Sequence, residues 1–127
     1  MAKWANDEVM DAALNYIKGQ ADKISCCVTT PTTFTEAVST YKLAYSDISG
    51  ADFTGPTNGD ASGRKITVGQ KADVPVSTTG SAQHIALVDT SGSGKLLYVT
   101  DVSGVQTVTS GNTMTFNTWD IEIADPT

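Results

Sequence analysis

The first residues in this sequence that could carry chemistry are Gly92-Ser93-Gly94-Lys95, which invite comparison with a phosphate-binding loop. Such a loop has a longer glycine spacing, followed by Lys and then by Ser or Thr at the start of a helix. Here Leu96 follows Lys95 and opens an apolar run that is typical of a strand. Because no helix N-terminus would face a phosphate, the sequence argues against a nucleotide site.

His84 is the only histidine, and a zinc site built on it would need carboxylates for all its other ligands. The order of residues suggests no Ser-His-Asp or Cys-His arrangement. The run 58–60 (NGD) could offer oxygen ligands to Ca²⁺, but the same residues are typical of a turn. The acidic pairs Asp7-Glu8 and Asp120/Glu122 have no apolar setting that would raise a carboxyl pKa. We therefore expect no catalytic residues, no metal and no cofactor.

The two cysteines, Cys26 and Cys27, are adjacent and cannot join distant parts of a fold. A bond between them would be strained, so we expect free thiols in a reducing cytosol. The opening residues 1–8 contain no apolar stretch of the kind found in a signal peptide. No apolar run approaches the length of a membrane span. The prediction is a protein made and folded inside a cell, with no membrane partner.

The length and composition of the chain fit one domain over residues 1–127 with a core of its own. Hydrophobic residues make up 39% of the chain, which is too many for a disordered protein. The net charge is −6, and nucleic-acid binding needs clustered Lys and Arg instead. We predict a soluble β protein that does not bind nucleic acid.

The element that opens the chain is an amphipathic helix predicted at about residues 7–18. Asn6 or Asp7 can cap it, Lys18 suits its C-terminal end, and Gly19 is the expected stop. Its apolar residues fall at three- and four-residue spacings: Val9, Met10, Ala13, Leu14, Tyr16 and Ile17. We expect this face to pack on the protein's own sheet, although a partner-binding helix would show the same pattern.

The next segment alternates between strands and one short helix. Strands are predicted at 23–28 and 41–45. Between them, Thr33 and Glu36 match a capping box, which predicts a second short helix to about Thr40. From 46 to 63, four turn pairs follow one another closely, which predicts a long surface loop anchored by Ile48 and Phe53, with at most a short edge strand near 52–54.

The remainder, residues 64–127, is rich in strands. A hairpin at 84–100 is the centre of the predicted sheets, because its apolar runs are nearly continuous, as in strands covered on both faces. Further strands are expected at 64–68, 72–77, 105–109, 113–116 and 119–123. The predicted fold is a mainly β, single-domain β-sandwich or barrel with the N-terminal helix packed against it.

Two aromatic residues lie outside this regular alternation and are the candidate partner contacts. Trp4 precedes the first helix in a polar segment. It either staples the start of the helix or anchors another subunit, because Trp is enriched at binding hot spots. Phe53 in the predicted long loop raises the same question.

Four parts of the chain carry a family resemblance: 1–11 (MAKWANDEVMD), 52–56 (DFTGP) with 62–65 (SGRK), 84–89 (HIALVD) and 119–123 (WDIEI). Together they resemble small structural proteins that tailed bacteriophages encode among their head genes, similar in size and texture to capsid decoration (cement) proteins. The resemblance is one of general pattern over most of the chain and identifies no binding residues.

The resemblance implies a virion protein, made in the host cytoplasm, that binds the outer surface of the major capsid protein lattice and is not an enzyme. Many identical sites on a lattice favour additional contacts between neighbouring copies, so a homo-oligomer on the capsid is expected. Two other roles in the virion stay open: a head-tail or tail component, and a receptor- or carbohydrate-binding module of a tail fibre.

Overall fold

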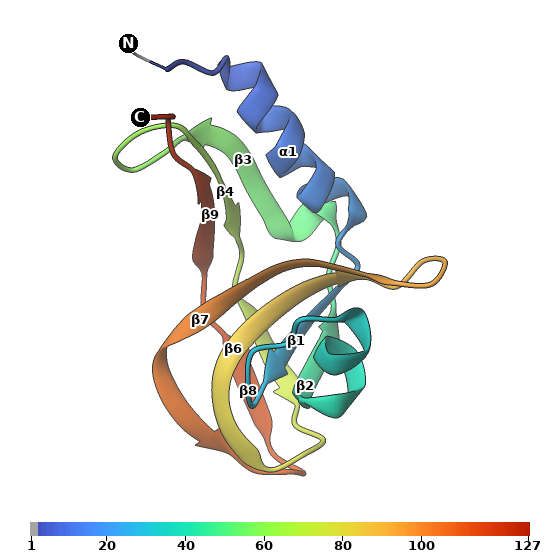
Figure 1. Cartoon of the computed structure of the whole chain (residues 1–127). Coiled ribbons are helices and arrows are strands. Elements are labelled where there is room, and N and C mark those ends of the chain that lie inside the picture. The colour runs from blue at the N-terminus through green and yellow to red at the C-terminus, as the bar shows by residue number, and fades with distance from the viewer. Residues whose placement is uncertain (1–2) are drawn as a thin grey trace.

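Two long antiparallel strands, β6 (Gly80–Asp89) and β7 (Lys95–Val108), dominate the computed structural model, which describes residues 3–127 (Figure 1). The predicted hairpin is therefore present, but it is longer than expected. The segment 105–109, predicted as a separate strand, is the far end of the same ribbon, where Val108 pairs with Gly80. A register shift between Ala82 and His84 bends the ribbon without ending it.

The other strands complete three antiparallel sheets. One has the order β2-β1-β6-β7, the second β3-β4-β9, and the third is the pair β5-β8. Their bounds are β1 (Lys23–Cys27), β2 (Lys42–Asp47), β3 (Phe53–Asn58), β4 (Arg64–Val68), β5 (Lys71–Pro75), β8 (Thr113–Phe116) and β9 (Trp119–Ile123). The strand fraction is 48% against 19% helix, so the mainly β prediction is confirmed, although the sheets do not close into a barrel.

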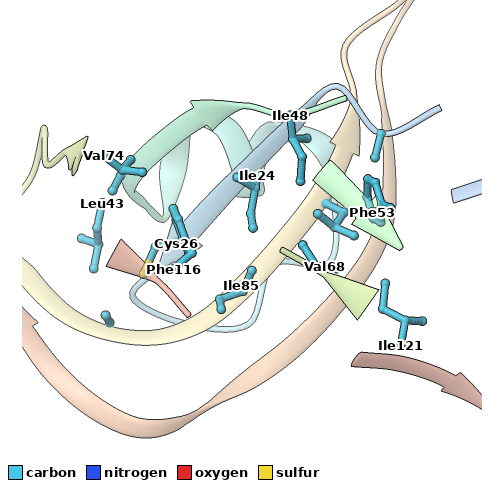
Figure 2. Packing of buried hydrophobic residues seen from close by; sticks show 14 of the residues in the cluster. Ile24, Cys26, Leu43, Ile48, Phe53, Val68, Val74, Ile85, Phe116 and Ile121 are labelled. Atoms are coloured by element: carbon cyan, nitrogen blue, oxygen red, sulfur yellow. The ribbon is translucent and has the colours of Figure 1, made fainter. Parts of the chain in front are cut away.

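Strand β6 is covered on both faces, as its apolar run predicted. Ile85 and Leu87 belong to the main core, whereas Ala86 and Val88 belong to a smaller cluster around Ala37. Figure 2 shows part of the main core, in which residues of β1, β2, β6 and the β3-β4-β9 sheet come together. The central strand thus separates two apolar layers, which explains why its sequence lacks a clean polar alternation.

Helix α1 (Asp7–Gln20) begins as predicted, with the Asn6 side chain accepting a hydrogen bond from the Glu8 amide at 2.7 Å. It runs past Gly19 and ends at Ala21, whose amide bonds to the Ile17 carbonyl. The buried stripe is narrower than expected, because only Met10 and Leu14 within the helix are buried. Over residues 3–127, no helix is long and apolar enough to cross a membrane.

The second short helix is η1 (Glu36–Thr40), a wide π-helical segment. Half of its predicted capping box is present, because the Glu36 amide donates to the Thr33 hydroxyl at 3.2 Å. The other half differs: the Glu36 carboxylate accepts bonds from the amide and hydroxyl of Thr32, at 2.8 and 2.9 Å. The resulting turn places Ala37 under β6 in the smaller cluster.

The prediction of a long surface loop over 46–63 is wrong, whereas the edge strand predicted near 52–54 is present and is longer than expected. This stretch contains the turn η2 (Gly50–Asp52) and all of β3, which pairs with β4 from Phe53↔Val68 onward. The Gly55-Pro56 pair resembles a turn in sequence but forms a bulge in the strand, between Thr54 and Thr57. Gly55 has φ of +104°, and a side chain there would meet the backbone of β4.

Both cysteines are free and fully buried. Burial raises the pKa of the Cys26 thiol to about 12, so the reactive thiolate is scarce at neutral pH. We expect a thiol-specific disulfide reagent at pH 8 to leave the folded protein unmodified and to titrate both thiols after denaturation. Rapid reaction of the folded protein would contradict this packing of β1.

Asp89 closes the turn after β6. Its buried carboxylate accepts bonds from the hydroxyl and the amide of Ser91, at 2.6 and 2.9 Å, and these bonds lower the pKa of Asp89. A lowered folded-state pKa means that Asp89 contributes its full stability above the ordinary aspartate value of about 3.9 and loses it as the pH falls.

We therefore expect urea unfolding to show a loss of stability as the pH falls below about 4, and Asp89→Asn to make that loss smaller. Asp125→Asn, at an exposed position, is the matched control for the loss of one carboxylate. An identical acid dependence in wild type and Asp89→Asn would contradict the role of this turn.

Candidate functional site

Apolar side chains gather where helix α1 meets the C-terminal end of the chain. A shallow hollow of about 320 Å³ is present there, and its walls come from both segments. The residues that line it are Ala5, Val9, Met10, Ala13, Ile123, Ala124 and Pro126. Trp4 directly precedes this lining and is 80% exposed. We call the hollow together with Trp4 the chain-end surface; Figure 1 shows the two chain segments side by side.

The cap of α1 explains why Trp4 is outside the core. With Asn6 as the cap, the position that would staple the helix belongs to Ala5, and its partner four residues into the helix is Met10. Both of those residues line the hollow. Trp4 lies one residue farther out and remains exposed, so the stapling interpretation of Trp4 is wrong.

Two polar contacts fix α1, and with it the hollow, against the sheet. Arg64 of β4 forms a bidentate ion pair with Asp11, with N–O distances of 2.8 and 3.2 Å. Near the other end of the helix, the Lys18 ammonium donates to the Gly55 carbonyl at 2.9 Å. A bidentate guanidinium–carboxylate pair constrains direction as well as distance, so the chain-end surface is presented on a positioned helix.

Two acidic residues border the hollow of the chain-end surface, whereas the exposed Lys3 precedes Trp4. Glu8 is adjacent to Val9 on the helix, and Asp125 lies between Ala124 and Pro126 on the C-terminal side. Both side chains are exposed, and within residues 3–127 neither joins an ion pair. A partner with an apolar centre and basic residues around it would match this surface.

Phe53, the other candidate partner contact, lies elsewhere. It is 5% exposed and belongs to the main core with Ile48 and Val68. Its burial follows from the pairing of β3 with β4, so the surface of the molecule does not offer Phe53 to a partner. The hollow itself was not predicted from the sequence, because Ile123, Ala124 and Pro126 come from the opposite end of the chain to α1.

His84 lies in a polar arrangement that the order of residues did not suggest. Its Nε2 is 3.1 Å from the Thr30 hydroxyl, and its Nδ1 is 2.9 Å from the Asp101 carboxylate. Hydroxyl, imidazole and carboxylate follow one another in the order of hydrolytic triads, but Nδ1 forms no hydrogen bond to a described residue, so the imidazole–carboxylate link of a triad is missing. Moreover, neither Thr30 nor His84 lines the hollow or the groove described next. The arrangement links β6, β7 and the segment after β1. Of its contacts, only the cross-strand pair His84↔Asp101 could have been predicted from the sequence, through the pairing of β6 with β7.

A second concave feature is a groove of about 690 Å³ between β7 and the β8–β9 segment. Most of its wall is polar, and Trp119 is its largest side chain. Among the described strands, β7 pairs only with β6, β8 only with β5 and β9 only with β4, so three strand edges are unpaired near the groove. We call this feature the β7–β9 groove.

The side chains considered for metal binding are engaged otherwise. Asp60 pairs with Lys65 at 2.7 Å, and its amide donates to Glu122 at 2.6 Å. Both contacts stabilise the turn to which Asp60 belongs. No cluster of three or more His, Cys, Asp or Glu side chains suited to a metal occurs in the part of the chain that the structure describes.

Comparison with models of protein families, with curated protein sequences and with solved structures finds no match to this chain.

Proposed function

We propose that this protein is a structural component of a tailed-bacteriophage particle, a capsid decoration protein that binds the outer surface of the major capsid lattice. The observation that carries the proposal is the chain-end surface, where an 80% exposed Trp4 adjoins an apolar hollow on a firmly held helix. Exposed apolar surface of this kind marks a site of protein–protein contact. The choice of a phage capsid as partner rests on the sequence resemblance.

The chain-end surface has the make-up of an interface centre. Aromatic side chains at such centres supply much of the binding free energy, and a surrounding polar edge excludes water. Here Trp4 and Val9 are the exposed apolar groups, at 80% and 65%, and Glu8 and Asp125 are the acidic residues that border the hollow. We propose that the capsid surface offers an apolar depression with basic residues around it.

A lattice of identical sites also favours contacts between copies. Each copy needs only modest affinity for the capsid if its neighbours bind one another as well. We therefore propose that the protein forms a symmetric oligomer on the capsid, around a symmetry axis of the lattice.

The competing function is a hydrolase that uses the Thr30, His84 and Asp101 arrangement. We expect His84→Ala to leave particle binding unchanged. We also expect no enzymatic activity that depends on His84, because Thr30 and His84 line neither the hollow nor the β7–β9 groove. Screening wild type and His84→Ala against ester, amide and glycoside substrates tests this. A hydrolytic activity present in wild type and absent from His84→Ala would refute the structural proposal.

The proposal is tested by mixing the purified protein with purified particles from which it has been omitted. Sedimentation should carry the protein down with the particles until the sites are saturated, with a fixed number of copies for each capsid. Bare tails, prepared separately, should bind none. Saturable binding to tails but not to capsids would favour the head-tail or tail alternative and contradict the decoration role.

A further inference from the structure

The β7–β9 groove is a second site, separate from the chain-end surface. Its volume of about 690 Å³ lies within the range of small-molecule binding sites. Strand β8, which forms part of its wall, lies toward the end of the molecule away from the two termini (Figure 1). A copy attached through its chain-end surface would therefore leave this groove open to solvent.

The groove wall is built from uncharged hydrogen-bonding side chains. It includes six threonines, two asparagines and one glutamine, and of the described residues that line it none carries a positive charge. Of its two carboxylates, Asp120 accepts from Thr67 at 2.7 Å and from Lys65 at 3.3 Å, whereas Asp101 is exposed and lies 2.9 Å from the His84 ring. A phosphate or carboxylate ligand would find no cation there, so the wall suits a neutral ligand rich in hydroxyl groups.

Trp119 supplies the aromatic part of the site. It stacks on Tyr98, with ring centroids 5.9 Å apart and planes inclined by 26°, and it also borders the groove. Its indole nitrogen is buried and has no hydrogen-bond partner among the described residues. The part of Trp119 that the groove offers to a ligand is therefore its ring and not its N–H group.

We propose that the β7–β9 groove binds a neutral oligosaccharide. Sugar rings combine weakly polar C–H faces, which pack on an aromatic ring, with hydroxyl groups that both donate and accept hydrogen bonds. Trp119 would meet the face of a sugar ring, and the Thr, Asn and Gln side chains would bind the hydroxyls. The unpaired edges of β7, β8 and β9 also suit an extended peptide, but a wall dominated by hydroxyl and amide side chains favours the sugar.

The test begins with the purified protein on an array of neutral and acidic glycans. Neutral glycans that bind are then titrated against the Trp4→Phe variant, in which Trp119 is the only tryptophan, so its fluorescence reports on the groove. We expect saturable binding of one class of neutral oligosaccharide, with a change in Trp119 emission.

Three variants localise the binding. Trp119→Leu removes the aromatic ring, whereas Gln106→Ala and Asn117→Ala shorten exposed side chains in the groove wall. Each should weaken binding by about two- to tenfold, as expected for the loss of one ring contact or one uncharged hydrogen bond. The matched controls Gln83→Ala and Asn15→Ala, at exposed positions outside the groove, should bind like wild type.

The inference would be overturned if no neutral glycan bound, if only acidic glycans bound, or if the groove variants bound like the controls. Binding of an extended peptide from a display library, which no glycan displaces, would assign the groove to a protein partner instead. All these results are independent of capsid binding, which the sedimentation experiment measures separately.

Discussion

Replacing Trp4 with alanine is expected to weaken binding to the capsid by about thirtyfold, which corresponds to about 2 kcal/mol. Trp4 is 80% exposed in the free protein, so its burial at the centre of an interface would remove a large apolar surface from water. Sedimentation of Trp4→Ala with purified particles, over a range of protein concentrations, measures the change in the dissociation constant.

The same substitution should leave the free energy of unfolding within about 0.5 kcal/mol of wild type, because Trp4 makes no part of the core. Trp4→Phe is the conservative control and should keep most of the binding. Unchanged binding by Trp4→Ala would locate the anchor elsewhere. A large loss of stability would mean that Trp4 packs on its own helix after all.

Replacing Leu14 with alanine is expected to lower the free energy of unfolding by about 2–5 kcal/mol. Leu14 is fully buried on the inner face of α1 and belongs to the main core cluster. The substitution removes apolar contacts and leaves a cavity that the sheet below can close only in part. Chemical denaturation of wild type and Leu14→Ala, followed by circular dichroism, measures the difference.

Val9→Ala is the matched substitution on the other side of the same helix. Val9 is 65% exposed and lines the hollow, so its loss should change stability by less than about 0.5 kcal/mol and should weaken capsid binding. Leu14 and Val9 thus separate the two roles of α1. Equal destabilisation by both variants would contradict the description of α1 as a helix with one buried and one exposed face.

Local patterns predicted most of the secondary structure. The start of α1 follows from the Asn6 cap, and the central hairpin follows from two apolar runs around a Gly- and Ser-rich turn. The stretch 46–63 could not be predicted in this way, because its Gly-Pro and Asn-Gly pairs occur in a bulged strand and at its end as readily as in a loop. The continuity of β7 through Gly104 could not be predicted either, because a glycine occurs in an irregular strand as well as in a turn.

The candidate sites were only partly accessible from sequence. Trp4 was identified as unusual, but its exposure depends on Ala5 occupying the stapling position. The hollow, the His84 arrangement and the β7–β9 groove each combine segments that are distant in the chain. Their detection requires the pairing of strands and the docking of α1, which no local pattern specifies.

Electron cryo-microscopy of purified particles tests whether the protein decorates a phage capsid. We expect density for this fold at regular positions on the outer capsid surface, with α1 and the C-terminal end facing the lattice and the β7–β9 groove facing outward. Density at the head-tail junction, along the tail or at a fibre tip, with none on the capsid, would contradict this expectation.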